Sequence, residues 1–146
     1  MRIPWSEQMM IGHLLLDSDH ERIVALINDL NDSISSSANC GRLMDKYCQI
    51  IDSLGEHFTR EEQIMISVKY PEADCHRKAH WHLFDQLTKM THLLECNAPM
   101  AVQNVITFLN EWFFQHVMIS DKKLAAHLLH QLEGAGRYNV ISSNVK

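Results

Sequence analysis

Apolar residues recur at helical spacing along most of the chain, in blocks separated by short polar, glycine- or proline-containing segments. Ser18 and Glu21 have the spacing of a capping box, which predicts that the first helix begins at Ser18. A polar segment over 35–41 ends it, and a second helix is expected from about Arg42 to Val68. Tyr70 precedes a proline and therefore avoids the α region, so the helix should end before it.

The second half of the chain predicts two more long helices and a short one. The third helix is expected from about Ala73 to Leu94. Asn97 is a candidate N-cap for the fourth, with Pro99 in its first turn. A short C-terminal helix is expected over 120–132, closed by glycines at 134 and 136.

Four long helices with short links predict an all-α protein, an up-down-up-down antiparallel four-helix bundle with an N-terminal arm and a short C-terminal helix. The length of 146 residues fits one domain over 1–146, with its core at about 17–132 and a tail at 134–146. The positions expected to face the interior are Ile23, Leu26, Ile27, Leu30, Ile34, Leu43, Tyr47, Ile50, Ile51, Leu54, Phe58, Met65, Val102, Val105, Ile106, Leu109, Trp112 and Phe113.

Composition and charge exclude several classes of function. A formal net charge of -5 without a basic stripe argues against nucleic-acid binding. No apolar run reaches the length of a transmembrane helix, and the N-terminus does not have the pattern of a signal peptide. Four cysteines without a C-x-x-C pair are typical of reduced thiols, so we expect a cytoplasmic protein without a membrane partner. The ten histidines are not explained by composition.

Two pairs of potential metal ligands have the spacing that places both members on one helix face. His57 and Glu61 are four residues apart, or about 40° around a helix, and so are His76 and His80. Such a pair can bind one ion without bending the backbone. The first helix adds His20.

The fourth helix carries His116 and, five residues later, Asp121. This spacing places them roughly 140° apart on a regular helix. For the two to meet, the helix must loosen or restart, and Ser120 is a candidate cap for a restart.

A single pair is weak evidence, since i, i+4 histidines are common on surface helices. The combination is stronger, because burying five imidazoles and two carboxylates without a cation would cost much desolvation free energy. The sequence therefore predicts a metal cluster inside the bundle.

The ordered motifs resemble the hemerythrin and bacteriohemerythrin family. A histidine follows an aspartate by three positions (Asp17, His20), and H-F-x-x-E-E begins at His57. A Tyr-Pro pair precedes H-x-x-x-H, and W-x-x-x-H-x-x-x-x-D, which starts at Trp112, completes the series. The resemblance covers the chain from Trp5 to about Leu132. It departs at Asp19, where the family usually has glutamine, a position we take as peripheral.

The resemblance implies a non-haem centre of two iron ions, with an Fe–O–Fe or hydroxo bridge. It implies His76, His80 and His116 on one iron, His20 and His57 on the other, and Glu61 and Asp121 bridging both. By this count the iron with two histidines has five ligands, which leaves one position for a small molecule.

The implied function is reversible binding of O₂ for storage, carriage or delivery, with NO or azide as other possible ligands. We expect no enzymatic activity, since no positioned proton donor is evident near the open iron. The alternative is a sensor of oxygen, nitric oxide or redox state that acts through a separate, unknown protein partner.

Several neighbouring residues have simpler interpretations. Trp112, Phe113 and Phe58 should be core residues that also line the pocket. Glu62 should be solvated or support a ligand. His82 should fill the bundle side or support a ligand, the other four histidines (His13, His92, His127, His130) should lie on the surface or tail, and Cys75 should be in the core.

Overall fold

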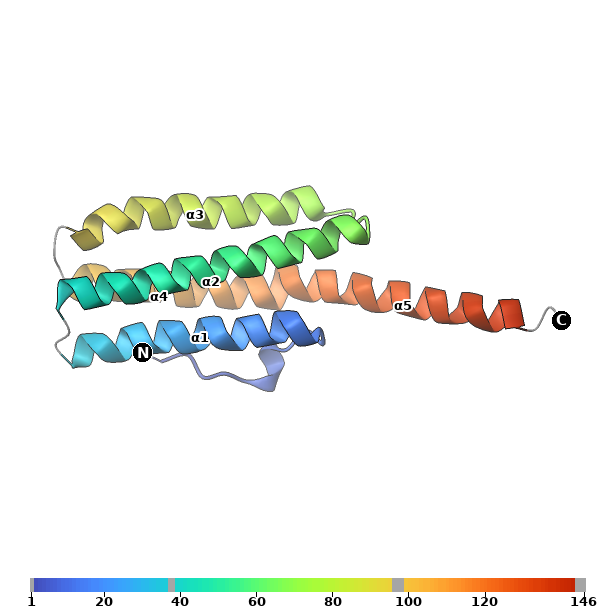
Figure 1. Cartoon of the computed structure of the whole chain (residues 1–146), viewed down its shortest axis with the longest axis horizontal. Helices are drawn as coiled ribbons and strands as arrows, with labels where there is room; N and C mark the ends of the chain where they lie inside the picture. Colours follow the sequence, from blue (N-terminus) through green and yellow to red (C-terminus); the bar gives the residue numbers. More distant parts are fainter. Residues whose placement is uncertain (1, 37–38, 96–98, 144–146) are drawn as a thin grey trace.

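The computed structural model describes residues 2–36, 39–95 and 99–143, and these form helices without strands (Figure 1). A short 3₁₀ turn, η1 (Glu7–Met9), precedes the long helices. The remaining elements are α1 (Leu14–Ser35), α2 (Cys40–Ser67), α3 (Ala73–Glu95), α4 (Pro99–Gln115), η2 (His116–Asp121) and α5 (Lys122–Ser143).

The long helices form an antiparallel four-helix bundle. α1 packs on α2, α2 on α3, α3 on α4, and α4 back on α1, so the bundle closes around one core. Successive helices run in opposite directions in Figure 1. This confirms the predicted all-α class.

The interior holds the predicted apolar stripes. Most of the expected positions are buried, while Leu26, Ile34, Leu43, Ile51 and Trp112 are half-buried at the rim of the core. The N-terminal arm adds Met9, which is buried in the same core.

The start of α1 differs from the prediction. The helix begins at Leu14, and the His13 side chain accepts a hydrogen bond from the Leu16 amide at 3.4 Å. The buried carboxylate of Asp17 accepts hydrogen bonds from the amides of Ile11 at 2.7 Å and Gly12 at 3.1 Å. Because these contacts organise the entry of the chain, Ser18 lies inside the helix and not at its cap.

The ends of α2 and α3 lie close to the predicted bounds. The Asn39 side chain caps α2 by accepting from the Arg42 amide at 2.9 Å. At the other end, the Tyr70 amide donates to the Met65 carbonyl at 2.9 Å, and Lys69 has a φ of 51°. α2 therefore closes shortly before the Tyr-Pro pair.

The C-terminal half of the chain is one continuous helical rod. α4, η2 and α5 follow each other without a break, and α5 extends well beyond the ends of the other helices (Figure 1). Of the two alternatives for this point, the restart at Ser120 is therefore wrong, and the predicted closure at Gly134 is wrong as well. Glycine inside a helix is unfavourable by only about 1 kcal/mol relative to alanine, so it does not force an end. The candidate cap Asn97 lies outside the described residues.

Across the described ranges, no helix combines the length and the apolarity that crossing a bilayer requires.

Candidate metal centre

The seven predicted ligand residues meet inside the bundle. They come from α1, α2, α3 and η2, and each has at most 6% of its surface exposed. Their donor atoms fall into two groups, and within each group the atoms lie within 4.8 Å of one another. The first group holds Glu61, His76, His80 and His116, and the second holds His20, His57 and Asp121.

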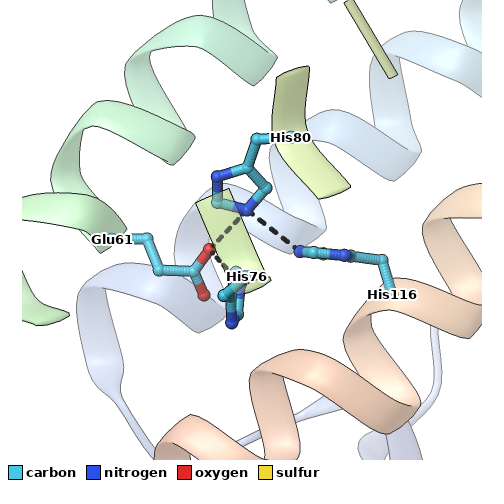
Figure 2. A group of neighbouring side chains, drawn as sticks. All are labelled: Glu61, His76, His80 and His116. Carbon is cyan, nitrogen blue, oxygen red and sulfur yellow. Dashed lines mark hydrogen bonds and ion pairs between the residues drawn. The ribbon is translucent and has the colours of Figure 1, made fainter. Parts of the chain in front are cut away.

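In the three-histidine group, two imidazoles meet one carboxylate oxygen and the third imidazole meets one of these two (Figure 2). Oε2 of Glu61 lies 3.1 Å from Nε2 of His76 and 3.1 Å from Nε2 of His80. Nε2 of His80 lies 3.0 Å from Nε2 of His116. All three imidazoles therefore place Nε2 inside the same small group of donor atoms.

The two-histidine group has a similar arrangement. Nε2 of His20 lies 3.2 Å from Nε2 of His57 and 3.1 Å from Oδ2 of Asp121. Two imidazoles and one carboxylate thus face one another in this group.

The two carboxylates reach both groups. Oδ1 of Asp121 lies 3.1 Å from Nε2 of His76 and 3.0 Å from Nε2 of His116, although its other oxygen faces His20. Oε2 of Glu61 lies 4.0 Å from Nε2 of His57. Both acids therefore lie where they could bridge two ions.

A π-helical turn explains how His116 and Asp121 come together. Residues His116–Asp121 form a π-helix, in which hydrogen bonds join residues five apart. The wider turn returns Asp121 to the face of His116, which a regular helix would not do. This confirms that the helix loosens at this point.

The donor set fits metal ions. Two ligands at right angles, each about 2.1 Å from an ion, lie about 3.0 Å apart, and the inward nitrogens are separated by 3.0–3.2 Å. Oε1 of Glu61 is buried without a hydrogen-bond partner among the described residues, and both oxygens of Asp121 are buried against histidine nitrogens. Buried anionic oxygens are costly unless a cation compensates them.

The charges of the metal-free site are strongly coupled. Burial alone would raise the pKa of Asp121, but the charge of His116 and hydrogen bonds from His116, His20 and His76 hold it well below its ordinary value. Burial alone would lower the pKa of His76, but Asp121 and Glu61 together raise it to about 9. The pocket therefore has the negative carboxylates that a cation requires.

Two further carboxylates support the outer sides of the imidazoles. Oδ2 of Asp19 lies 3.3 Å from Nδ1 of His57, and Oε1 of Glu62 lies 3.1 Å from Nδ1 of His80. Glu62, for which support of a ligand is one of the two expected roles, is in contact with the candidate ligand His80. Asp19, taken as peripheral from the sequence, is in contact with a candidate ligand. It also forms an ion pair with Arg60.

Aromatic rings surround the histidines. Phe58 stacks on His80 with ring centroids 3.8 Å apart, and Phe113 and His20 form a T-shaped pair with ring centroids 5.6 Å apart. Trp112 stacks on His116. The three aromatic residues predicted to line the pocket therefore lie beside it.

Two other predictions about neighbouring residues are wrong. His82 and Cys75 are both exposed. Cys75 comes one residue before the buried His76, and His82 comes two residues after the buried His80. These offsets are about 100° and 200° around the helix, so both side chains point away from the core.

The fold and the site together define a four-helix bundle that encloses a histidine-rich centre for two metal ions. The sequence model of the family described as "Hemerythrin HHE cation binding domain" matches residues 12–128. The chain therefore belongs to the hemerythrin family.

Named relatives cover most of this chain. A myohemerythrin of Theromyzon tessulatum is 29% identical over 124 residues, which are 85% of this chain and 92% of the relative. A bacteriohemerythrin of Ralstonia nicotianae is 28% identical over 127 residues, or 86% and 88% of the two chains. A bacteriohemerythrin of Stenotrophomonas maltophilia is 25% identical over 130 residues, or 85% and 82%.

Hemerythrin-family proteins bind oxygen at a non-haem di-iron centre. The two buried groups described above are the part of this chain that could hold the two iron ions.

Proposed function

We propose that this protein binds molecular oxygen reversibly at its di-iron centre, to store, carry or deliver it. The observation that supports this most directly is the unequal distribution of histidines. Three imidazoles surround one position and two surround the other, while both carboxylates reach both positions.

In the proposed assignment, His76, His80 and His116 bind one iron, and His20 and His57 bind the other. Glu61 and Asp121 would each contribute oxygens to both. When bound, the iron pair supplies the electrons and the coordination position that reversible oxygen binding requires. The position with fewer imidazoles would have room for a small molecule, by the logic that distinguishes open from closed metal sites.

The residues around the histidines serve two purposes in this proposal. Glu62 and Asp19 hold the outer nitrogens of two imidazoles, which orients the inner nitrogens toward the ions. Phe58 and Phe113 are buried against the rings and exclude water from them. A dry site favours binding of a neutral gas over hydrolytic or proton-transfer chemistry.

Reversibility is tested by metal analysis followed by spectroscopy. We expect two irons per chain, and a visible charge-transfer band that forms when the reduced protein meets oxygen and disappears under inert gas. Azide added to the oxidised protein should occupy the same position and shift the band. One zinc per chain, or oxidation by air that inert gas does not reverse, would contradict the proposal.

A further inference from the structure

The candidate ligand His57 is held from its outer side by two residues from different helices. Its Nε2 faces the metal centre, and its Nδ1 lies 3.3 Å from Oδ2 of Asp19. Asp19 belongs to α1 and Arg60 to α2, and Asp19 forms an ion pair with Arg60. Three side chains thus form one chain of contacts from the surface to the centre.

Burial increases along this chain of contacts. The side chains of Arg60, Asp19 and His57 are 38%, 18% and 1% exposed. The guanidinium therefore meets solvent, while the imidazole is enclosed. Arg60 follows His57 by about one helical turn, which places both on the side of α2 that faces α1.

The carboxylate determines which nitrogen of His57 carries the proton. A carboxylate only accepts hydrogen bonds, so the Nδ1 that contacts it must be the protonated nitrogen. The lone pair is then on Nε2, which is the atom directed at the ion. The negative charge behind the ring also makes the imidazole a stronger electron donor.

The three-histidine group contains a comparable contact between a carboxylate and the outer nitrogen of an imidazole. Glu62 lies 3.1 Å from Nδ1 of His80, so each group has one imidazole with a carboxylate behind it. In the two-histidine group this support is concentrated on one ring, because Nδ1 of His20 has no hydrogen-bond partner among the described residues.

We infer that Asp19, fixed by Arg60, is the positioning residue for His57 and sets the metal affinity and the reduction potential of the two-histidine position. This inference rests on the proposed function, because it takes His57 to be a metal ligand. Asp19 acts through His57 and does not itself bind the ion.

The test compares Asp19→Asn with a matched variant. Asp29→Asn removes another ion pair between α1 and α2, that of Asp29 with Lys46, and it contacts none of the candidate ligands. Metal-free protein is titrated with Co²⁺, and the iron-loaded protein is titrated electrochemically. Circular dichroism and thermal unfolding report whether each variant folds.

Asp19→Asn should bind the second Co²⁺ about 10-fold or more weakly, within the range usual for the loss of an outer-sphere partner. Its iron pair should have a more positive reduction potential, since a negative charge that favours the oxidised state is removed. Arg60→Gln should also weaken binding of the second Co²⁺, by less than Asp19→Asn does, because Asp19 keeps its charge but is less firmly held. Asp29→Asn should leave both unchanged even if it lowers the melting temperature.

Two failures can be distinguished. If the unmodified protein does not bind two metal ions, the proposed function is wrong. If it does bind two, the inference is overturned by either of two results. Folded Asp19→Asn could have the same metal affinity and reduction potential as the unmodified protein, or Asp29→Asn could shift both as much as Asp19→Asn does. Either result would mean that Asp19 only joins two helices.

Discussion

Oδ1 of Asp121 lies 3.0 Å from Nε2 of His116 across a single π-helical turn. The turn accommodates one residue more than a regular α-helical turn, so the carboxylate at the fifth position points back into the bundle. The next helix, α5, continues from there without interruption. One local departure from α-geometry thus places a candidate bridging ligand and does not end the helix.

This geometry predicts that iron binding requires the carboxylate at position 121, and that a carboxylate elsewhere in the same turn does not replace it. Ser120 is half-buried beside a surface depression lined by Tyr70 and Lys123. Moving the acid there, in the double variant Ser120→Asp/Asp121→Ser, should leave the centre without its second bridge. We expect iron analysis to give clearly fewer than two irons per chain.

Ser120→Asp alone is the control for this change, because it adds the new charge but keeps Asp121. It should retain two irons. Two irons in the double variant would mean that the turn rearranges and that its π geometry does not determine the ligand.

The fold could be predicted from the sequence where many residues contribute to one signal. The stripes of α1 and α2 are long enough to define helices that packing against neighbours then stabilises. The ends depend on single contacts, and these are less predictable. The side chain of Asp17 accepts hydrogen bonds from residues before α1. The local sequence gives no reason to prefer this start of the helix over the capping box at Ser18.

The candidate ligands could be predicted because their spacing along each helix fixes a common face. Their outer partners depend on how closely two helices approach, which one helix cannot reveal. Asp19 contacts His57 from α1, and Glu62 contacts His80 from α2. The available signal for Asp19 is its place next to His20, with Arg60 one turn after His57 on the facing helix.

His76 contacts both carboxylates, at 3.1 Å each, so its removal should affect the whole centre. His76→Ala should lower the iron content and the melting temperature together, because metal binding contributes to the free energy of folding. The measurements are iron analysis and thermal unfolding with and without a chelator. His82→Ala, an exposed histidine of the same helix, should change neither. Equal losses in the two variants would show that the ligand set is wrong.

The metal-free protein should lose stability as the pH rises from neutral toward 9. Asp121 and Glu61 outweigh burial and raise the pKa of His76 from 6.5 to about 9. The folded state therefore holds this proton more tightly than the unfolded state. The resulting stability is complete below pH 6.5 and is lost as the pH rises through about 9. Urea unfolding of metal-free protein at several pH values measures this.

His76→Gln cannot take up the proton, so its unfolding free energy should be flatter over the same pH range. A metal ion must displace the proton from His76, so Zn²⁺ added near neutral pH should release it into a weakly buffered solution. An identical pH profile in His76→Gln would assign the dependence to other groups.

The last prediction separates the two aromatic neighbours of the fourth helix. Phe113 is 2% exposed and faces His20, in the group with two histidines. Trp112 is half-buried and stacks on His116, in the group with three, with ring centroids 4.4 Å apart. If the open position belongs to the two-histidine iron, Phe113 is the one of these two rings that lies beside it. Phe113→Ala should then keep two irons but speed autoxidation and azide entry, because water and anions gain a path to the ion.

Truncating a fully buried phenylalanine also lowers the free energy of unfolding, by about 3–5 kcal/mol. Phe113→Leu retains more of the buried volume, so it keeps the comparison meaningful if the alanine variant does not fold. Trp112→Ala should destabilise the protein less and change autoxidation little, because three histidines, two carboxylates and the bridging oxygen would already fill six positions on the iron of its side. Stopped-flow azide binding and the decay of the oxygenated band under air measure both rates. Faster azide entry in Trp112→Ala than in either Phe113 variant would place the open position on the three-histidine side, since the ring whose loss admits the anion marks the iron that receives it.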